Sequence, residues 1–119
     1  MNLIRFYVFL KDKPYKIIGT VCLHNISRAY FQSCEIGYKF SSEYHRMGYA
    51  TEAIWQCLSI AFLDLNLHKV FAMVNTNNTP SICLLDSIGF HNDGINRDYI
   101  KAHDKWQDHF IYSFLSNEL

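Results

Sequence analysis

The stretch SSEYHRMGYATEAIWQCLSIAF, residues 41–62, joins a polar loop to an amphipathic helix, with Gly48 at the junction. Apolar residues recur three and four positions apart from Ala50 to Leu65, which predicts a helix of about four turns ending near LNLH. A helix start presents unpaired N–H groups and the positive end of the helix dipole, so this junction suits an anion. Gly48 would let a ligand approach the backbone without a Cβ in the way, and Arg46 would add a charge. A glycine here is also an ordinary turn residue, and the GK(S/T) element of a Walker loop is missing.

The segments around this stretch predict a mixed α/β domain of the α+β kind. Runs rich in β-branched and aromatic residues, bounded by turn residues, are typical of strands. The predicted strands are residues 4–11, 15–26, 33–41, 69–75 and two strands within 90–115 around a turn at 103–105. The first two are expected to form a hairpin across Lys11–Pro14.

A second helix is predicted after the strand at 69–75. Asn78 or Thr79 caps it, Pro80 suits its first turn, and Gly89 stops it. The predicted order is therefore β-β-β-α-β-α-β-β. The strands before and after the first helix are expected to be parallel, because a helical crossover is the usual parallel connection.

The length and composition of the chain indicate a single globular domain and argue against some kinds of partner. The 119 residues carry no linker, repeat or low-complexity tract, so a single domain, 1–119, is expected. Hydrophobic residues make up 50% of the chain, enough for a real core, and the formal net charge of zero argues against a nucleic-acid partner held by phosphate contacts. The apolar run near the N-terminus is too short to span a bilayer and no cleavage site follows it, so we expect a soluble, cytoplasmic protein without a membrane partner.

The four cysteines, Cys22, Cys34, Cys57 and Cys83, are far apart and lie in apolar surroundings. No CxxC pair and no zinc-like Cys/His spacing occurs, so the sequence predicts no metal site. The cysteines are expected to be buried free thiols of a reducing compartment.

Residues 45–50, HRMGYA, resemble the pyrophosphate loop of the GNAT superfamily, the acetyl-CoA-dependent N-acetyltransferases, whose pattern is Q/R-x-x-G-x-G/A. His45 departs from the usual Gln or Arg, and Arg46-Met47 replaces a more common Gly-Lys. The tail GYATEA is similar to the RimJ/RimL branch, which acetylates protein N-termini, notably of ribosomal proteins. Further motifs of that branch follow in order: IGY at 36–38, N-x-x-S and GF within 78–90, and a tryptophan before D…YS within 106–113.

The resemblance implies acetyl-CoA as cosubstrate and a sheet whose two parallel strands splay apart. It implies that backbone N–H groups from Arg46 to Ala50 bind the pyrophosphate, and that pantetheine hydrogen-bonds a strand edge. The implied coenzyme-binding residues are Tyr38, Lys39, Phe40, His45, Arg46, Met47, Gly48, Tyr49, Ala50 and Asn78. A helix cap explains Asn78 almost equally well.

Acetyl transfer needs a neutral amine, donors near the thioester oxygen and a proton for the leaving thiolate. Many relatives place a tyrosine for that proton where this chain has Leu85. RimL-like members use a serine at the place of Ser81, so the resemblance makes Ser81 the candidate donor. The alternative is that Ser81 is only a polar residue of a first helical turn.

Glu35 is the candidate base, because it lies on the strand leading to the loop, on the face opposite Cys34 and Ile36. It would deprotonate the amine directly or through water. Glu52, in the first turn of the first helix, is explained more simply by the helix dipole. Further candidates with no decisive argument are His24, His109 and Asp108.

Relatives in this family begin with another strand and two helices before residues 4–11, so the chain is expected to be short at its N-terminus. The coenzyme site then looks complete, the acceptor wall incomplete, and apolar sheet surface is left that a homodimer would cover. Three functions stay open. They are acetylation of a peptide N-terminus, acetylation of a small amine such as a polyamine or aminoglycoside, and coenzyme A binding without turnover.

Overall fold

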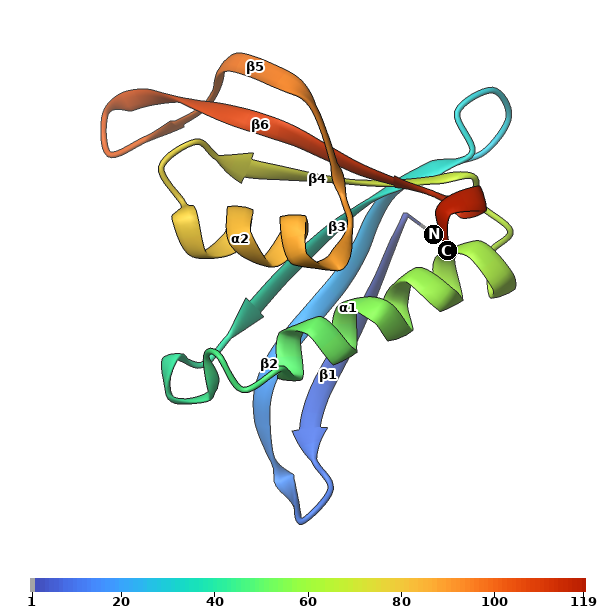
Figure 1. The fold of residues 1–119 in the computed structure, drawn as a ribbon, viewed down its shortest axis with the longest axis vertical. Helices are drawn as coiled ribbons and strands as arrows, with labels where there is room; N and C mark the ends of the chain where they lie inside the picture. The colour runs from blue at the N-terminus through green and yellow to red at the C-terminus, as the bar shows by residue number, and fades with distance from the viewer. Residues whose placement is uncertain (1) are drawn as a thin grey trace.

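The computed structural model describes residues 2–119 as one six-stranded sheet with two helices (Figure 1). The strands are β1 (Leu3–Leu10), β2 (Lys13–Ser27), β3 (Ser33–Phe40), β4 (Lys69–Asn75), β5 (His91–Ala102) and β6 (Lys105–Leu115). The helices are α1 (Tyr49–Ser59) and α2 (Thr79–Ile88), and the short helical turns are η1 (Ser42–Tyr44), η2 (Ile60–Asp64) and η3 (Ser116–Glu118). The strands lie in the order β1-β2-β3-β4-β6-β5.

The predicted element order is confirmed, and so is the parallel pairing of β3 with β4. One local prediction is wrong. The first hairpin turns at 11–12, and Pro14 lies inside β2, where the strand extends beyond the end of β3 and needs no N–H for a neighbour. The predicted length of the first helix is confirmed, but its last turn, η2, is π-helical, and its backbone bonds include Leu65 N–H to the Ile60 carbonyl at 2.9 Å.

Both helices cover the same face of the sheet, as Figure 1 shows. Alternate strand residues point into this layer, because successive side chains of a strand face opposite sides. The fully buried side chains include Val21, Leu23, Cys34, Ile54, Leu58, Val70 and Leu85. The opposite face carries exposed apolar side chains on β1, namely Leu3, Tyr7 and Phe9. No helix among residues 2–119 covers that face.

The centre of the sheet opens between β3 and β4. The two strands pair only from Ser33–Glu35 to Lys69–Phe71, whereas β3 stays paired with β2 as far as Phe40. β4 instead pairs with β6 along its whole length, from Lys69 to Asn75. Within residues 2–119, the edge of β3 from Ile36 to Phe40 therefore has no strand beside it on the β4 side, as the family resemblance implied.

The prediction of four buried thiols is wrong for two of them. Cys34 and Cys57 are buried, but Cys22 is half-buried and Cys83 is exposed on α2. Burial raises the pKa of the Cys34 thiol to about 12 and that of Cys57 to about 11. Residues 2–119 contain no cluster of three or more potential metal ligands. In the same part of the chain, no helix is long and apolar enough to cross a membrane.

Candidate active site

The loop before α1 has the backbone of an anion site. Arg46 and Gly48 both adopt left-handed conformations, with φ of 65° and 83°, and Gly48 is the N-cap of α1. Among the residues that the structure describes, no side chain caps this helix start. Within residues 2–119, no acceptor takes the N–H groups of residues 46–51, and the first bond of the helix runs from Glu52 N–H to the Gly48 carbonyl. A Cβ added at Gly48 would meet nothing within 4 Å, so the space above the loop is open.

His45 holds this loop against the end of β3. Its Nε2 lies 2.9 Å from the carbonyl oxygen of Phe40, the last residue of the strand. The rings of Tyr44 and Tyr49, which flank the loop in the sequence, meet edge to face with centroids 6.1 Å apart. The residue that departs from the family pattern therefore has a local role, which is to fix the loop relative to the strand edge. Met47 is exposed.

A hydrogen bond between two side chains joins the edge of β3 to helix α2. The Tyr38 hydroxyl on β3 and the Ser81 hydroxyl on α2 lie 2.5 Å apart and are hydrogen-bonded. Asn78 is the N-cap of α2, and its Oδ1 accepts a hydrogen bond from Ser81 N–H at 3.3 Å. Burial raises the pKa of the Tyr38 phenol, and its hydrogen bond to Ser81 acts in the opposite direction. The side chain of Lys39 is not part of this group, since it is an exposed residue between Tyr38 and Phe40.

Glu35 lies where the β3–β4 pairing ends, opposite Phe71. Its carboxylate has two close partners from β2: His24 Nε2 lies 3.4 Å from Oε2, and Asn25 Nδ2 donates to Oε1 at 3.1 Å. The Glu35 side chain is only 14% exposed, so it is held rather than free in solvent. The neighbouring Gly37 leaves room for the imidazole, whose Cε1 would be 3.3 Å from a Cβ there.

Sequence reasoning treated His24 and Glu35 as separate candidates and missed that they form a pair. The signal was available in the hairpin, because His24 and Glu35 are directly opposite in the β2–β3 register. Their side chains lie on the same face of the sheet, since directly opposed residues in an antiparallel pair share a face. The pair lies on the face that α1 and α2 leave uncovered, because the flanking Cys34 and Ile36 point into the buried core.

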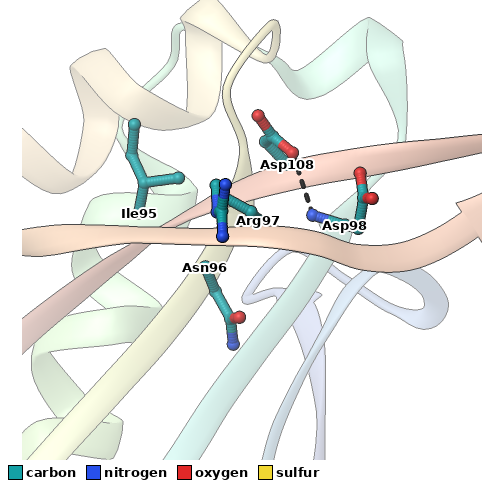
Figure 2. Close-up of a pocket in the computed structure, with 5 residues that line it drawn as sticks. All are labelled: Ile95, Asn96, Arg97, Asp98 and Asp108. Carbon is teal, nitrogen blue, oxygen red and sulfur yellow. Dashed lines mark hydrogen bonds between the residues drawn. The ribbon is translucent and has the colours of Figure 1, made fainter.

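Two other candidate residues, Asp108 and His109, lie on β6. Asp108 Oδ1 accepts a hydrogen bond from Asp98 N–H at 2.9 Å and so closes a bulge of β5 against β6 (Figure 2). Ile95, Asn96, Arg97, Asp98 and Asp108 line a shallow pocket there, which no coenzyme-binding candidate touches. The ring of His109 packs against that of Tyr99 with centroids 5.2 Å apart. Asp108 thus has a structural role in the bulge.

Residues 2–91 match the family described as the acetyltransferase (GNAT) domain. The chain belongs to the GNAT acetyltransferase family. The uncharacterized N-acetyltransferase p20 of Bacillus licheniformis is 36% identical over 96% of this chain and 63% of its own length.

Three solved GNAT structures share this fold. The ribosomal-protein-S5-alanine acetyltransferase of Vibrio fischeri has a TM-score of 0.91 and 31% identity, over 98% of this chain and 63% of that one. RimJ of Mycobacterium smegmatis, in complex with CoA-disulfide, has a TM-score of 0.92 and 29% identity, over 99% of this chain and 55% of that one. A spermidine N-acetyltransferase SpeG mutant from Vibrio cholerae has a TM-score of 0.89 and 26% identity, over 98% of this chain and 68% of that one. The chain thus spans between 55 and 68% of these three proteins.

Proposed function

We propose that this GNAT domain is an N-acetyltransferase that moves the acetyl group of acetyl-CoA to the N-terminal amine of a protein or peptide. One observation supports this most. The opening between β3 and β4 has unpaired N–H groups of residues 46–51 at one end and Glu35 where the opening begins. The Ser81 hydroxyl reaches it from α2 through its bond to Tyr38 on β3.

The coenzyme would lie along this opening. The pyrophosphate would accept hydrogen bonds from the N–H groups at the α1 start, where the helix dipole also favours negative charge. Pantetheine amides would pair with the free backbone edge of β3 between Tyr38 and Phe40, as an added strand does. In this arrangement the thioester would lie between the Ser81 hydroxyl and the Glu35 carboxylate. The match of the overall fold to a RimJ structure that contains CoA-disulfide supports the same placement.

The proposed base and the proposed proton donor lie on opposite faces of the sheet, Glu35 on the uncovered face and Ser81 on the helix-covered face. Glu35, with His24 beside it, would take the proton of the attacking ammonium, directly or through water. Ser81 would hydrogen-bond the sulfur as the C–S bond breaks and the thiolate leaves. The Asn25 amide that donates to Oε1 holds the Glu35 carboxylate in place for this role.

A single-charge acceptor fits this site better than a polyamine. Glu35 bonds to the imidazole of His24 and the amide of Asn25. It also lies near Tyr99, whose pKa is raised by burial and by the Glu35 charge, so these neighbours offer one carboxylate. A polyamine with several positive charges would require several carboxylates along its length. The relatives point the same way, because identity is 31% to the S5-alanine enzyme and 26% to the spermidine enzyme. A homodimer and a cytoplasmic location, both expected from the sequence, stay part of this proposal.

The test is calorimetric titration with acetyl-CoA, followed by thiol release over three acceptors: an alanine-initiated peptide, spermidine and an aminoglycoside. The wild-type chain should bind acetyl-CoA and release thiol with the peptide. Gly48→Asp should abolish binding, because it places a carboxylate and a Cβ at the pyrophosphate position.

Gly94→Asp is the matched control and should bind normally. Gly94 also has a positive φ, 138°, and also has nothing within 4 Å of an added Cβ, but it lies in β5. Thiol release with spermidine alone would show that the acceptor is a polyamine and not a peptide. Acetyl-CoA binding without thiol release on any acceptor would make the chain a coenzyme A-binding protein. Absence of binding would refute the account of the loop.

A further inference from the structure

The hydrogen bond between Tyr38 and Ser81 spans the opening that the proposed acetyl transfer would use. Tyr38 comes from β3, beyond the last residue that pairs with β4, and Ser81 comes from the first turn of α2. The two hydroxyl oxygens lie 2.5 Å apart, and neither side chain is exposed. Among residues 2–119, Tyr38 is the one partner of the Ser81 hydroxyl, while the Ser81 N–H bonds to Asn78.

Serine by itself is a poor source of a proton for a thiolate. An aliphatic hydroxyl is a far weaker acid than a thiol, whose pKa is about 8.5, so full proton transfer from serine to a thiolate is strongly unfavourable. A phenol, with an ordinary pKa of about 10, is a much stronger acid than the serine hydroxyl. Burial raises the pKa of Tyr38 above that value, so the phenol stays protonated at neutral pH.

We propose that Tyr38 is the proton source behind Ser81 in the acetyl transfer. The inference rests on the proposed function. When the tetrahedral intermediate collapses, the C–S bond breaks and its electron pair goes to sulfur. The sulfur takes the proton of the Ser81 hydroxyl, and Ser81 takes the proton of Tyr38. The resulting tyrosinate is reprotonated from solvent before the next turnover, so serine never carries a full negative charge.

The Tyr38 side chain acts through Ser81 in this scheme and does not touch the reacting atoms, which makes the phenol a positioning group. The scheme predicts that removing the phenol oxygen slows the chemical step and leaves coenzyme affinity unchanged. It also predicts that the phenol has no effect once the serine hydroxyl is gone. A merely structural role of Tyr38 would lower activity equally in both backgrounds.

The experiment is a double-mutant cycle on kcat for thiol release, with the acceptor that wild type uses best. Tyr38→Phe and Ser81→Ala should each lower kcat by about 10²-fold or more, the usual range for a proton donor, with the calorimetric Kd for acetyl-CoA changed less than twofold. The double variant should be no slower than Ser81→Ala. Tyr112→Phe is the control, since it removes the hydroxyl of another buried tyrosine on the helix-covered face, and its kcat should be unchanged.

The outcomes separate the inference from the proposed function. Wild-type turnover with an unchanged kcat for Tyr38→Phe overturns the inference alone. An equal loss on adding Tyr38→Phe to Ser81→Ala overturns it too, because the tyrosine then acts independently of the serine. A wild-type chain that binds acetyl-CoA but releases no thiol with any amine overturns the proposed function, and the inference with it. Melting curves of each variant show whether a loss of kcat reflects a loss of fold.

Discussion

Gly48→Ala tests whether the loop glycine is needed for a ligand or only for its backbone conformation. Gly48 has a φ of 83°, and an L-residue in the left-handed region costs roughly 1–2 kcal/mol. An added Cβ meets nothing within 4 Å, so in the free protein the whole cost is backbone strain. At about 4 °C per kcal/mol for a domain of this size, we expect Tm to fall by roughly 4–8 °C.

Gly89→Ala is the matched control for strain. Gly89 ends α2 with a φ of 110°, and its added Cβ would make an ordinary 3.6 Å contact with Phe114 Cε2. Its Tm should fall by a similar amount. The two variants should differ in binding, because only Gly48 lies where the pyrophosphate would approach the backbone.

The binding difference follows from the hydrogen bonds that the pyrophosphate would make. Each bond to a charged group contributes about 1.5–3 kcal/mol, so displacing the phosphate far enough to lose one weakens binding by roughly 10- to 100-fold. Gly48→Ala should show that loss by calorimetry, below the Tm of both variants, while Gly89→Ala stays within twofold of wild type. Acetyl-CoA at 100 times the wild-type Kd should stabilise wild type by about 2.7 kcal/mol and Gly48→Ala by far less.

The result that would refute this reasoning is a Gly48→Ala variant that melts lower but binds acetyl-CoA as tightly as Gly89→Ala does. The glycine would then serve the turn alone, and the N–H groups of residues 46–51 would not approach a ligand closely. A Gly48→Ala variant with an unchanged Tm would instead contradict the left-handed conformation at this position.

Glu35→Gln should lower kcat by roughly 10²- to 10⁴-fold while the Kd for acetyl-CoA is unchanged, because it removes a proton acceptor and not a coenzyme contact; an unchanged kcat would exclude Glu35 as the base. A thiol-reactive reagent at pH 8 should modify two cysteines of the native chain, and Cys34 and Cys57 only after denaturation, because burial raises their pKa values to about 12 and about 11. Since the unfolded thiols ionise near pH 8.5, the stability that these two neutral thiols contribute is full below that pH and is lost as pH rises through 11 and 12. Leu58→Ala should cost about 2–5 kcal/mol in urea unfolding, since the side chain is fully buried, and the control Leu63→Ala, 72% exposed, should change stability by less than about 0.5 kcal/mol.

The order and type of the elements could be predicted because their signals are local. Strand β4 alternates between buried and half-buried residues, and α2 has an Asn cap at one end and a left-handed glycine at the other. The predicted bounds of β4, 69–75, are confirmed, as is Gly89 as the end of α2. Such features depend on residues within a few positions of each other, so no knowledge of the fold is needed to find them.

The errors have tertiary causes. Pro14 looked like a turn residue, yet it stands in a strand because β3 ends before reaching it. The apolar surroundings of Cys83 suggested burial, but α2 turns this residue outward and Leu85 inward. Burial depends on which side of an element the neighbouring layer occupies, and the local sequence does not state that.

The sequence by itself determined the loop, its glycine and the family resemblance, because these reside in contiguous residues whose conformations are set by neighbours along the chain. Only the tertiary structure decided which side chains meet. Strand register brings His24 against Glu35, and the packing of α2 over the opened sheet brings Ser81 to Tyr38, 43 residues earlier. Contacts of this kind follow from pairing and packing over the whole domain, so the partners of a reacting group become visible only when the chain is folded.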